Sequence, residues 1–64
     1  SANMSNAEYK DLRTNKIDPL LRQASEYIEK AYALDNELSE ARSALRNIYY
    51  ILNDEENLKR VEAM

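Results

Sequence analysis

The sequence predicts an all-α fold, and three features of its composition support this prediction. The 64 residues include no glycine and one proline, whereas an average soluble chain contains about 7% and 5% of these residues. The chain has none of the Asn-Gly or Asp-Gly pairs that close β-hairpins. It is rich in Ala, Leu, Glu, Lys and Arg, which enter helices at the lowest cost in free energy. We therefore expect three to four helices, packed as antiparallel hairpins.

The first well-defined helix is expected over residues 19–34. Asp18 can cap free backbone amides, and Pro19 suits the first helical position because its missing N–H has no partner there. Apolar residues then recur at the helical spacing of three and four, namely Leu20, Leu21, Ala24, Ile28, Ala31 and Leu34. We expect these residues to form one buried face, and the helix to end near Asp35.

Two shorter helices are expected over residues 39–52 and 55–64. Ser39 marks the start of the first, and Asn53 and Asp54 form the turn between them, with Asp54 as the cap of the second. The apolar faces consist of Ala41, Ala44, Leu45, Ile48, Tyr49 and Leu52 in one helix and of Leu58, Val61 and Met64 in the other. Because both connections are short, consecutive helices must lie antiparallel.

Residues 1–17 give a weaker pattern than the rest of the chain. Their main apolar residues are Tyr9, Leu12 and Ile17, which stand among many polar ones. The triplet Ser5-Asn6-Ala7 has two interpretations, a remnant of cloning or native sequence, and we assign it no structural role in either case. We expect residues 1–17 to be loosely ordered or a degenerate helix, and residues 18–64 to form the folded helical segment.

The helices expected over residues 19–34 and 39–52 carry the residues of a known repeat. In the helix over residues 39–52, Leu45 and Tyr49 match the Leu and Tyr of the pattern W-x2-L-G-x2-Y, and Ala24 and Ala31 match its small positions in the preceding helix, in the same register. The chain thereby resembles the tetratricopeptide repeat (TPR) family over residues 19–64, about one and a half repeats. The resemblance implies the C-terminal or truncated end of an α-solenoid.

Four positions depart from the repeat pattern. Arg42 replaces its aromatic residue, Arg46 replaces the small residue that lets paired helices approach, Asn36 replaces the proline, and Leu58 replaces an alanine. Such divergence is typical of a terminal repeat, which must present a polar face to water instead of packing against a successor.

The resemblance also implies a ligand-binding face. TPR proteins bind their ligands on a concave face lined by the first helix of each repeat, and the matching positions here are Glu40, Ser43, Asn47, Tyr50 and Ile51. The family's basic clamp for a terminal carboxylate is not reproduced, because Ser43 stands where one lysine would be. From the residues alone, Tyr27, Tyr32 and Tyr50 can rim the core, lie at a partner interface, or cover neighbouring alkyl stems.

The composition argues against catalysis. The chain has no histidine or cysteine to act as a base, a thiolate or a soft metal ligand, and no glycine to form a phosphate-binding loop. The acidic run Asp54-Glu55-Glu56 lies at a helix start, where capping explains it better than calcium binding does. We expect no enzymatic activity, no cofactor and no metal site.

Charge and hydropathy narrow the class of partner. The nine basic and twelve acidic side chains alternate along the chain, which argues against nucleic-acid binding, and no window is long and apolar enough to enter a membrane. We expect a scaffold that binds a protein or peptide. The alternative is a structural helical segment that forms a homo-oligomer through exposed apolar faces. The compartment stays open, with the cytoplasm as the default and the periplasm if an upstream signal was removed.

Overall fold

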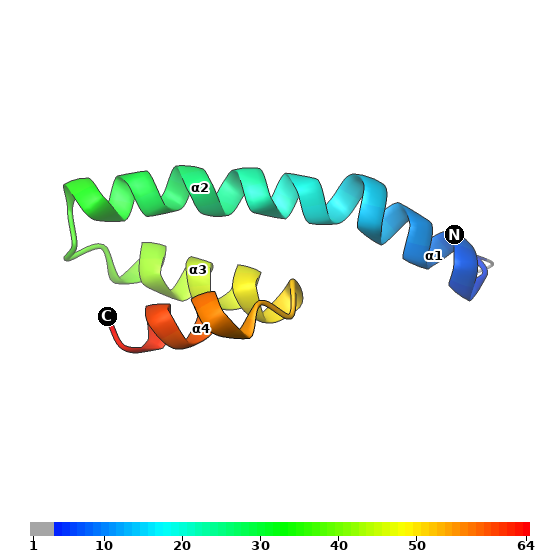
Figure 1. Ribbon diagram of the computed structural model, residues 1–64. Helices are drawn as coiled ribbons and strands as arrows, with labels where there is room; N and C mark the ends of the chain where they lie inside the picture. Colours follow the sequence, from blue (N-terminus) through cyan, green and yellow to red (C-terminus); the bar gives the residue numbers. More distant parts are fainter. Residues whose placement is uncertain (1–3) are drawn as a thin grey trace.

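A computed structural model describes residues 4–64, which form an all-α structure without a β-strand in that range. The elements are α1 (Asn6–Leu12), a π-helical turn η1 (Arg13–Ile17), α2 (Asp18–Leu34), α3 (Ser39–Ile51) and α4 (Glu55–Glu62). The first three form one continuous rod, α3 runs back along α2, and α4 runs back along α3 (Figure 1). The prediction of an all-α fold is confirmed. Residues 1–3, part of the segment expected to be loose, lie outside the described range.

The rod begins at Asn6, well before the helix start that was expected at Pro19. The Ser5 hydroxyl accepts a hydrogen bond from the Glu8 backbone N–H at 3.1 Å and donates one to the Glu8 carboxylate at 3.1 Å. The first bond satisfies one free backbone N–H at the helix start, and the second holds the two side chains together. Assigning no structural role to Ser5 was therefore wrong, because its hydroxyl caps α1.

Asp18 is not a helix cap, which corrects a second expectation. Its backbone is helical, its N–H donates to the Arg13 carbonyl five residues back, and its carboxylate binds the Arg13 guanidinium at 2.9 Å. A proline inside a helix clashes with the carbonyl four residues before it. The wider π-helical turn just before Pro19 leaves room for the ring, and α1 slopes away from the axis of α2 at this point (Figure 1).

The core lies between α2 and the hairpin of α3 and α4. Leu45 and Val61 are completely buried and Tyr49 is 3% exposed. Three half-buried residues pack around them, one from α2, one from the turn and one from α4: Ile28, Leu52 and Leu58. The predicted apolar face of α3 therefore does contact both neighbouring helices, as the antiparallel hairpin arrangement requires.

Two leucines expected in the core are exposed instead. Leu20 and Leu34 are 64% and 91% exposed, whereas Leu21 and Ile28 on the adjacent face of α2 are half-buried. The apolar residues of α2 cover two neighbouring faces, and the structure gives a partner helix to one of them. The expectation of a single buried face over α2 was therefore wrong.

The chain ends its helices without glycine. After α3, Asn53 adopts a left-handed φ of 57°. The Asp54 N–H donates to the Tyr49 carbonyl at 2.9 Å, and the Asn53 N–H donates to the Tyr50 carbonyl at 3.1 Å. This pair of bonds is a Schellman motif, in which asparagine takes the place that glycine usually holds. The backbone carbonyls left free at the end of α3 are satisfied in this way.

Two arginines bind the remaining carbonyls at helix ends. Arg42 donates to the carbonyls of Val61 at 3.3 Å and Glu62 at 3.0 Å at the end of α4. Arg13 donates to the Ile51 carbonyl at the end of α3. A cation at a helix C-terminus is favoured by the helix dipole. Arg42, which departs from the repeat pattern, therefore has a structural role.

Three side-chain contacts connect α2 to the α3–α4 hairpin. Arg22 binds Asp54 at 2.6 Å, and Arg60 binds Glu29 at 2.6 Å. The hydroxyl of the buried Tyr49 also donates to the Glu29 carboxylate. The hydrogen bond from Arg60 lowers the pKa of Glu29, and burial, followed by the hydrogen bond to Glu29, raises the pKa of Tyr49. Glu29 thus accepts bonds from both helices of the hairpin.

Candidate functional site

The five residues predicted to bind a partner lie on one exposed face of α3. Their spacing of three and four residues places them on the side of the helix opposite Leu45, and each is exposed: Glu40, Ser43, Asn47, Tyr50 and Ile51. Tyr50 is the most prominent apolar residue of this face, with 72% of its surface exposed. The face therefore offers a ring, an amide and a carboxylate to a partner.

This face borders a groove between α3 and α4. The groove has a volume of about 360 Å³ and is lined by Arg46, Asn47, Tyr50, Leu58 and Glu62. Two of the five predicted residues, Asn47 and Tyr50, lie in it. Glu40, Ser43 and Ile51 are not in its lining, so the structure brings only part of the predicted set together.

Sequence reasoning missed three lining residues. Arg46 and Glu62 bring opposite charges to the groove, and the half-buried Leu58 is an apolar part of its wall. Arg46 and Leu58 are two of the departures from the repeat pattern, where larger side chains replace small ones. The presence of large side chains at positions where the repeat has small ones could have indicated the groove, because a larger residue at a helix contact alters the surface between the helices.

The groove continues toward the turn between α3 and α4. A smaller depression of about 140 Å³ is shared by Tyr50 and Leu58 with the start of α4. Asp54 lines this end, and the hydrogen bond from Arg22, followed by those from the side chain and backbone of Asn57, lowers the pKa of Asp54 to about 2. The Asp54 carboxylate at this end of the groove is therefore paired with Arg22.

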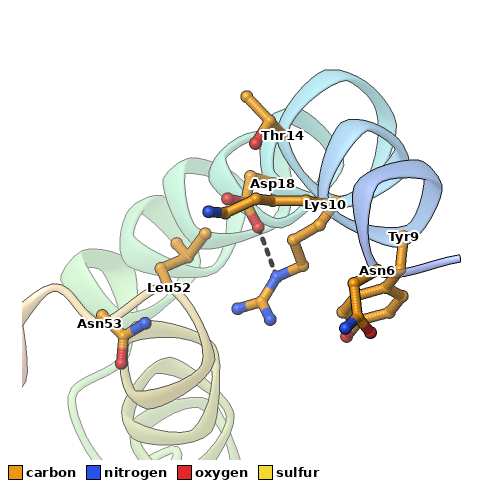
Figure 2. Close-up of a pocket in the computed structure, with 8 residues that line it drawn as sticks. Asn6, Tyr9, Lys10, Thr14, Asp18, Leu52 and Asn53 are labelled. Carbon is orange, nitrogen blue, oxygen red and sulfur yellow. Dashed lines mark hydrogen bonds and ion pairs between the residues drawn. The ribbon is translucent and has the colours of Figure 1, made fainter.

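A second concave site lies where the rod passes the turn between α3 and α4 (Figure 2). Its volume is about 460 Å³, and it is lined by Asn6, Tyr9, Lys10, Arg13, Thr14, Asp18, Leu52 and Asn53. The charged group at its centre is already engaged, because Arg13 binds Asp18 and the Ile51 carbonyl. Figure 2 shows Leu52 and Asn53 on the opposite side of this ion pair from Tyr9. The site is therefore best described as a structural junction.

The acidic side chains and the helices of the described residues bear on two further kinds of site. Within residues 4–64, no group of three or more Asp, Glu, His or Cys side chains is placed to hold a metal ion. No helix in this range has the length and apolar character needed to cross a bilayer. The groove offers a tyrosine ring, an amide and a pair of opposite charges to a partner.

The comparisons with known proteins do not identify a family. No protein-family model, no curated protein and no solved structure matches this chain significantly.

Proposed function

We propose that this chain is a non-catalytic protein-binding module, the end segment of a TPR-like α-solenoid. The observation that carries the proposal is the exposed face of α3, where Asn47 and Tyr50 continue into the groove between α3 and α4. Tyrosine is enriched at protein interfaces because it combines a large apolar surface with a polar tip. The antiparallel packing of α2, α3 and α4 and the TPR-like positions of Leu45 and Tyr49 support the proposed resemblance to the repeat.

The proposed partner is a protein or peptide rather than a nucleic acid. Four of the five arginines bind groups within the chain, namely Arg13, Arg22, Arg42 and Arg60. Phosphate binding needs free, clustered cations, and the chain carries a net charge of −3. No cofactor is part of the proposal.

A peptide library selected against the intact chain tests this function. The double substitution Asn47→Ala with Tyr50→Ala is expected to weaken binding of the selected peptides at least tenfold, because it removes the amide and the ring from the groove. The control is Tyr9→Ala, which removes a 51% exposed tyrosine from α1. Both variants should keep the wild-type circular dichroism spectrum. Peptides that bind the double variant as tightly as the wild type would exclude this face.

Self-association is a second candidate function. Its specific support is the exposure of Leu20, Tyr27 and Leu34 on α2, at 64%, 78% and 91%. Three large apolar residues exposed along one side of a helix favour an interaction surface. The two functions are compatible because α2 and the exposed face of α3 are separate surfaces.

A further inference from the structure

The exposed apolar residues of α2 have the spacing of a coiled-coil seam. Leu20, Tyr27 and Leu34 are seven residues apart, and smaller or half-buried residues alternate with them at steps of three and four. We call this set the α2 outer stripe, and its members are Ile17, the last residue of η1, and five residues of α2, namely Leu20, Ala24, Tyr27, Ala31 and Leu34. A repeat of this kind, with apolar residues alternately three and four apart, is the pattern by which one helix packs along another.

A depression on the stripe has the shape that such packing requires. It has a volume of about 290 Å³ and is lined by Tyr27, Lys30, Ala31 and Leu34. These residues are at positions i, i+3, i+4 and i+7, the four positions that form the hole for a side chain of a facing helix in a coiled coil. Ala31 is the small member, so the space above its methyl group is open to a large apolar side chain.

The stripe itself supplies side chains that fit this depression. We propose that the α2 outer stripe packs against the same stripe of a second copy of this chain, with the two helices antiparallel. In that arrangement Leu20 of each copy enters the depression over Ala31 of the other. The same register sets Tyr27 of each copy over Ala24 of the other. Large residues then face small ones in the middle of the contact, and at its two ends Ile17 of each copy meets Leu34 of the other.

The charges at the two ends of the stripe favour the antiparallel direction. Lys16 precedes the stripe and Asp35 follows it, and both side chains are exposed. An antiparallel pair sets Lys16 of each copy near Asp35 of the other, which gives two attractive contacts. A parallel pair would set Lys16 against Lys16 and Asp35 against Asp35, which is unfavourable. Charge complementarity therefore points to a second copy in this orientation.

The mass of the chain in solution tests whether a second copy binds the α2 outer stripe. This inference rests on the self-association proposed above. Light scattering at high micromolar concentration should give twice the 7.5 kDa of one chain. Tyr27→Asp buries a carboxylate in the proposed contact and should return the mass to that of a monomer. Tyr50→Asp, a matched change at a 72% exposed tyrosine of α3, should leave the dimer intact.

Cross-linking tests the direction of the helices. The chain has no cysteine, so an engineered disulfide reports only the pair that is introduced. Oxidation of an equimolar mixture of Leu20→Cys and Ala31→Cys chains should give mainly the mixed disulfide, because the Cα atoms must approach within about 7 Å. Each variant alone should remain largely uncross-linked. Efficient cross-linking of Leu20→Cys to itself would show parallel helices and overturn the inference.

The outcomes separate this inference from the self-association on which it rests. A dimer that persists in Tyr27→Asp would show that another face mediates self-association, and it would overturn the role of the stripe alone. A monomer at all concentrations would overturn both and leave the stripe for a helix of a different protein. Retained helicity of Tyr27→Asp by circular dichroism ensures that a loss of mass reflects a lost interface, since Tyr27 has no role in the core.

Discussion

Single residues at the ends of helices replace the glycines that this chain lacks. Asn53 holds the left-handed position of the Schellman motif after α3, with a φ of 57°. Asparagine tolerates this region better than other residues with a Cβ atom, because its short polar side chain can form local hydrogen bonds. The turn that sets α4 against α3 therefore depends on this one residue.

The effect of substituting Asn53 on stability should depend only on how well the new residue adopts a positive φ. Asn53→Ala is expected to lower the free energy of unfolding by about 1 kcal/mol, because alanine is disfavoured at positive φ. Asn53→Gly should be at least as stable as the wild type, because glycine has no Cβ atom. Urea denaturation followed by circular dichroism measures both. An alanine variant more stable than the glycine variant would contradict the left-handed conformation.

Asp54 makes the stability of the fold depend on pH. Its carboxylate accepts bonds from Arg22 on α2 and from Asn57 at the start of α4. These bonds lower the pKa of Asp54 from 3.8 to about 2 in the folded chain. Because the folded pKa is the lower one, the ionised form stabilises the fold above pH 3.8. This stabilisation is lost as the pH falls from there through about 2.

The thermal midpoint of Asp54→Asn, compared with that of the wild type, measures this contribution. The variant should melt below the wild type at pH 7, and the difference between the two should shrink as the pH falls from 4 to 2. Both proteins contain the same other carboxylates, so the comparison removes their effect. A difference that stays constant from pH 7 to pH 2 would show that Asp54 contributes no pH-dependent stability.

At the scale of elements, the rod of α1, η1 and α2 is one helix that accommodates an internal proline. The π-helical turn at Arg13–Ile17 widens the helix just before Pro19. Arg13 then binds both Asp18 and the end of α3, which fixes the rod against the hairpin. The position of α1 therefore depends on a local departure from α-helical geometry.

Pro19→Ala should stabilise the rod. Alanine restores a backbone N–H and removes the ring, and a proline in a helix interior costs about 3 kcal/mol relative to alanine. We expect a higher thermal midpoint and a stronger helical circular dichroism signal. The gain in the free energy of unfolding should be at most about 3 kcal/mol, because η1 already relieves part of the clash. A lower midpoint would mean that Pro19 acts as the start of a helix, as the sequence pattern first suggested.

The sequence predicted the three C-terminal helices closely because their signals are local. Apolar spacing marks α3, and Asp54 caps α4 as expected, with its carboxylate accepting the Asn57 N–H at 3.2 Å. The continuity of the rod was not predicted, because Asp18 and Pro19 have the pattern of a helix start. That reading ignored Arg13, which lies one turn earlier and engages the Asp18 carboxylate.

Two features depend on contacts between helices, which the spacing of residues within one helix does not encode. They are the exposed side of α2 and the groove between α3 and α4. Leu20 and Leu21 are neighbours in the sequence with equal hydropathy, yet the packing of α3 covers one of them more than the other. Only the position of the partner helix decides which of the two leucines is covered. The groove likewise combines Asn47 and Tyr50 of α3 with Leu58 and Glu62 of α4. The sequence predicted Asn47 and Tyr50 on the α3 side, and on the α4 side only the departure of Leu58 from the repeat pattern pointed to the groove.

For the whole molecule, the distribution of apolar surface accounts for both proposed functions. A chain of 64 residues buries only a small core, and domains of this size are marginally stable alone. The fully buried side chains in the described range are Leu45 and Val61, while the large residues Leu20, Tyr27 and Leu34 of the α2 outer stripe are exposed to water. Packing of that stripe against a second copy would add buried area to the fold and leave the face of α3 free for a partner.

Sedimentation equilibrium of the intact chain over a range of concentrations tests this account most directly. The account predicts a concentration-dependent transition to a species of twice the 7.5 kDa chain mass. It predicts that Tyr27→Asp abolishes this transition while the thermal unfolding of the monomer is unchanged. A chain that stays monomeric at the highest concentration, with the same cooperative unfolding as at the lowest, would contradict it.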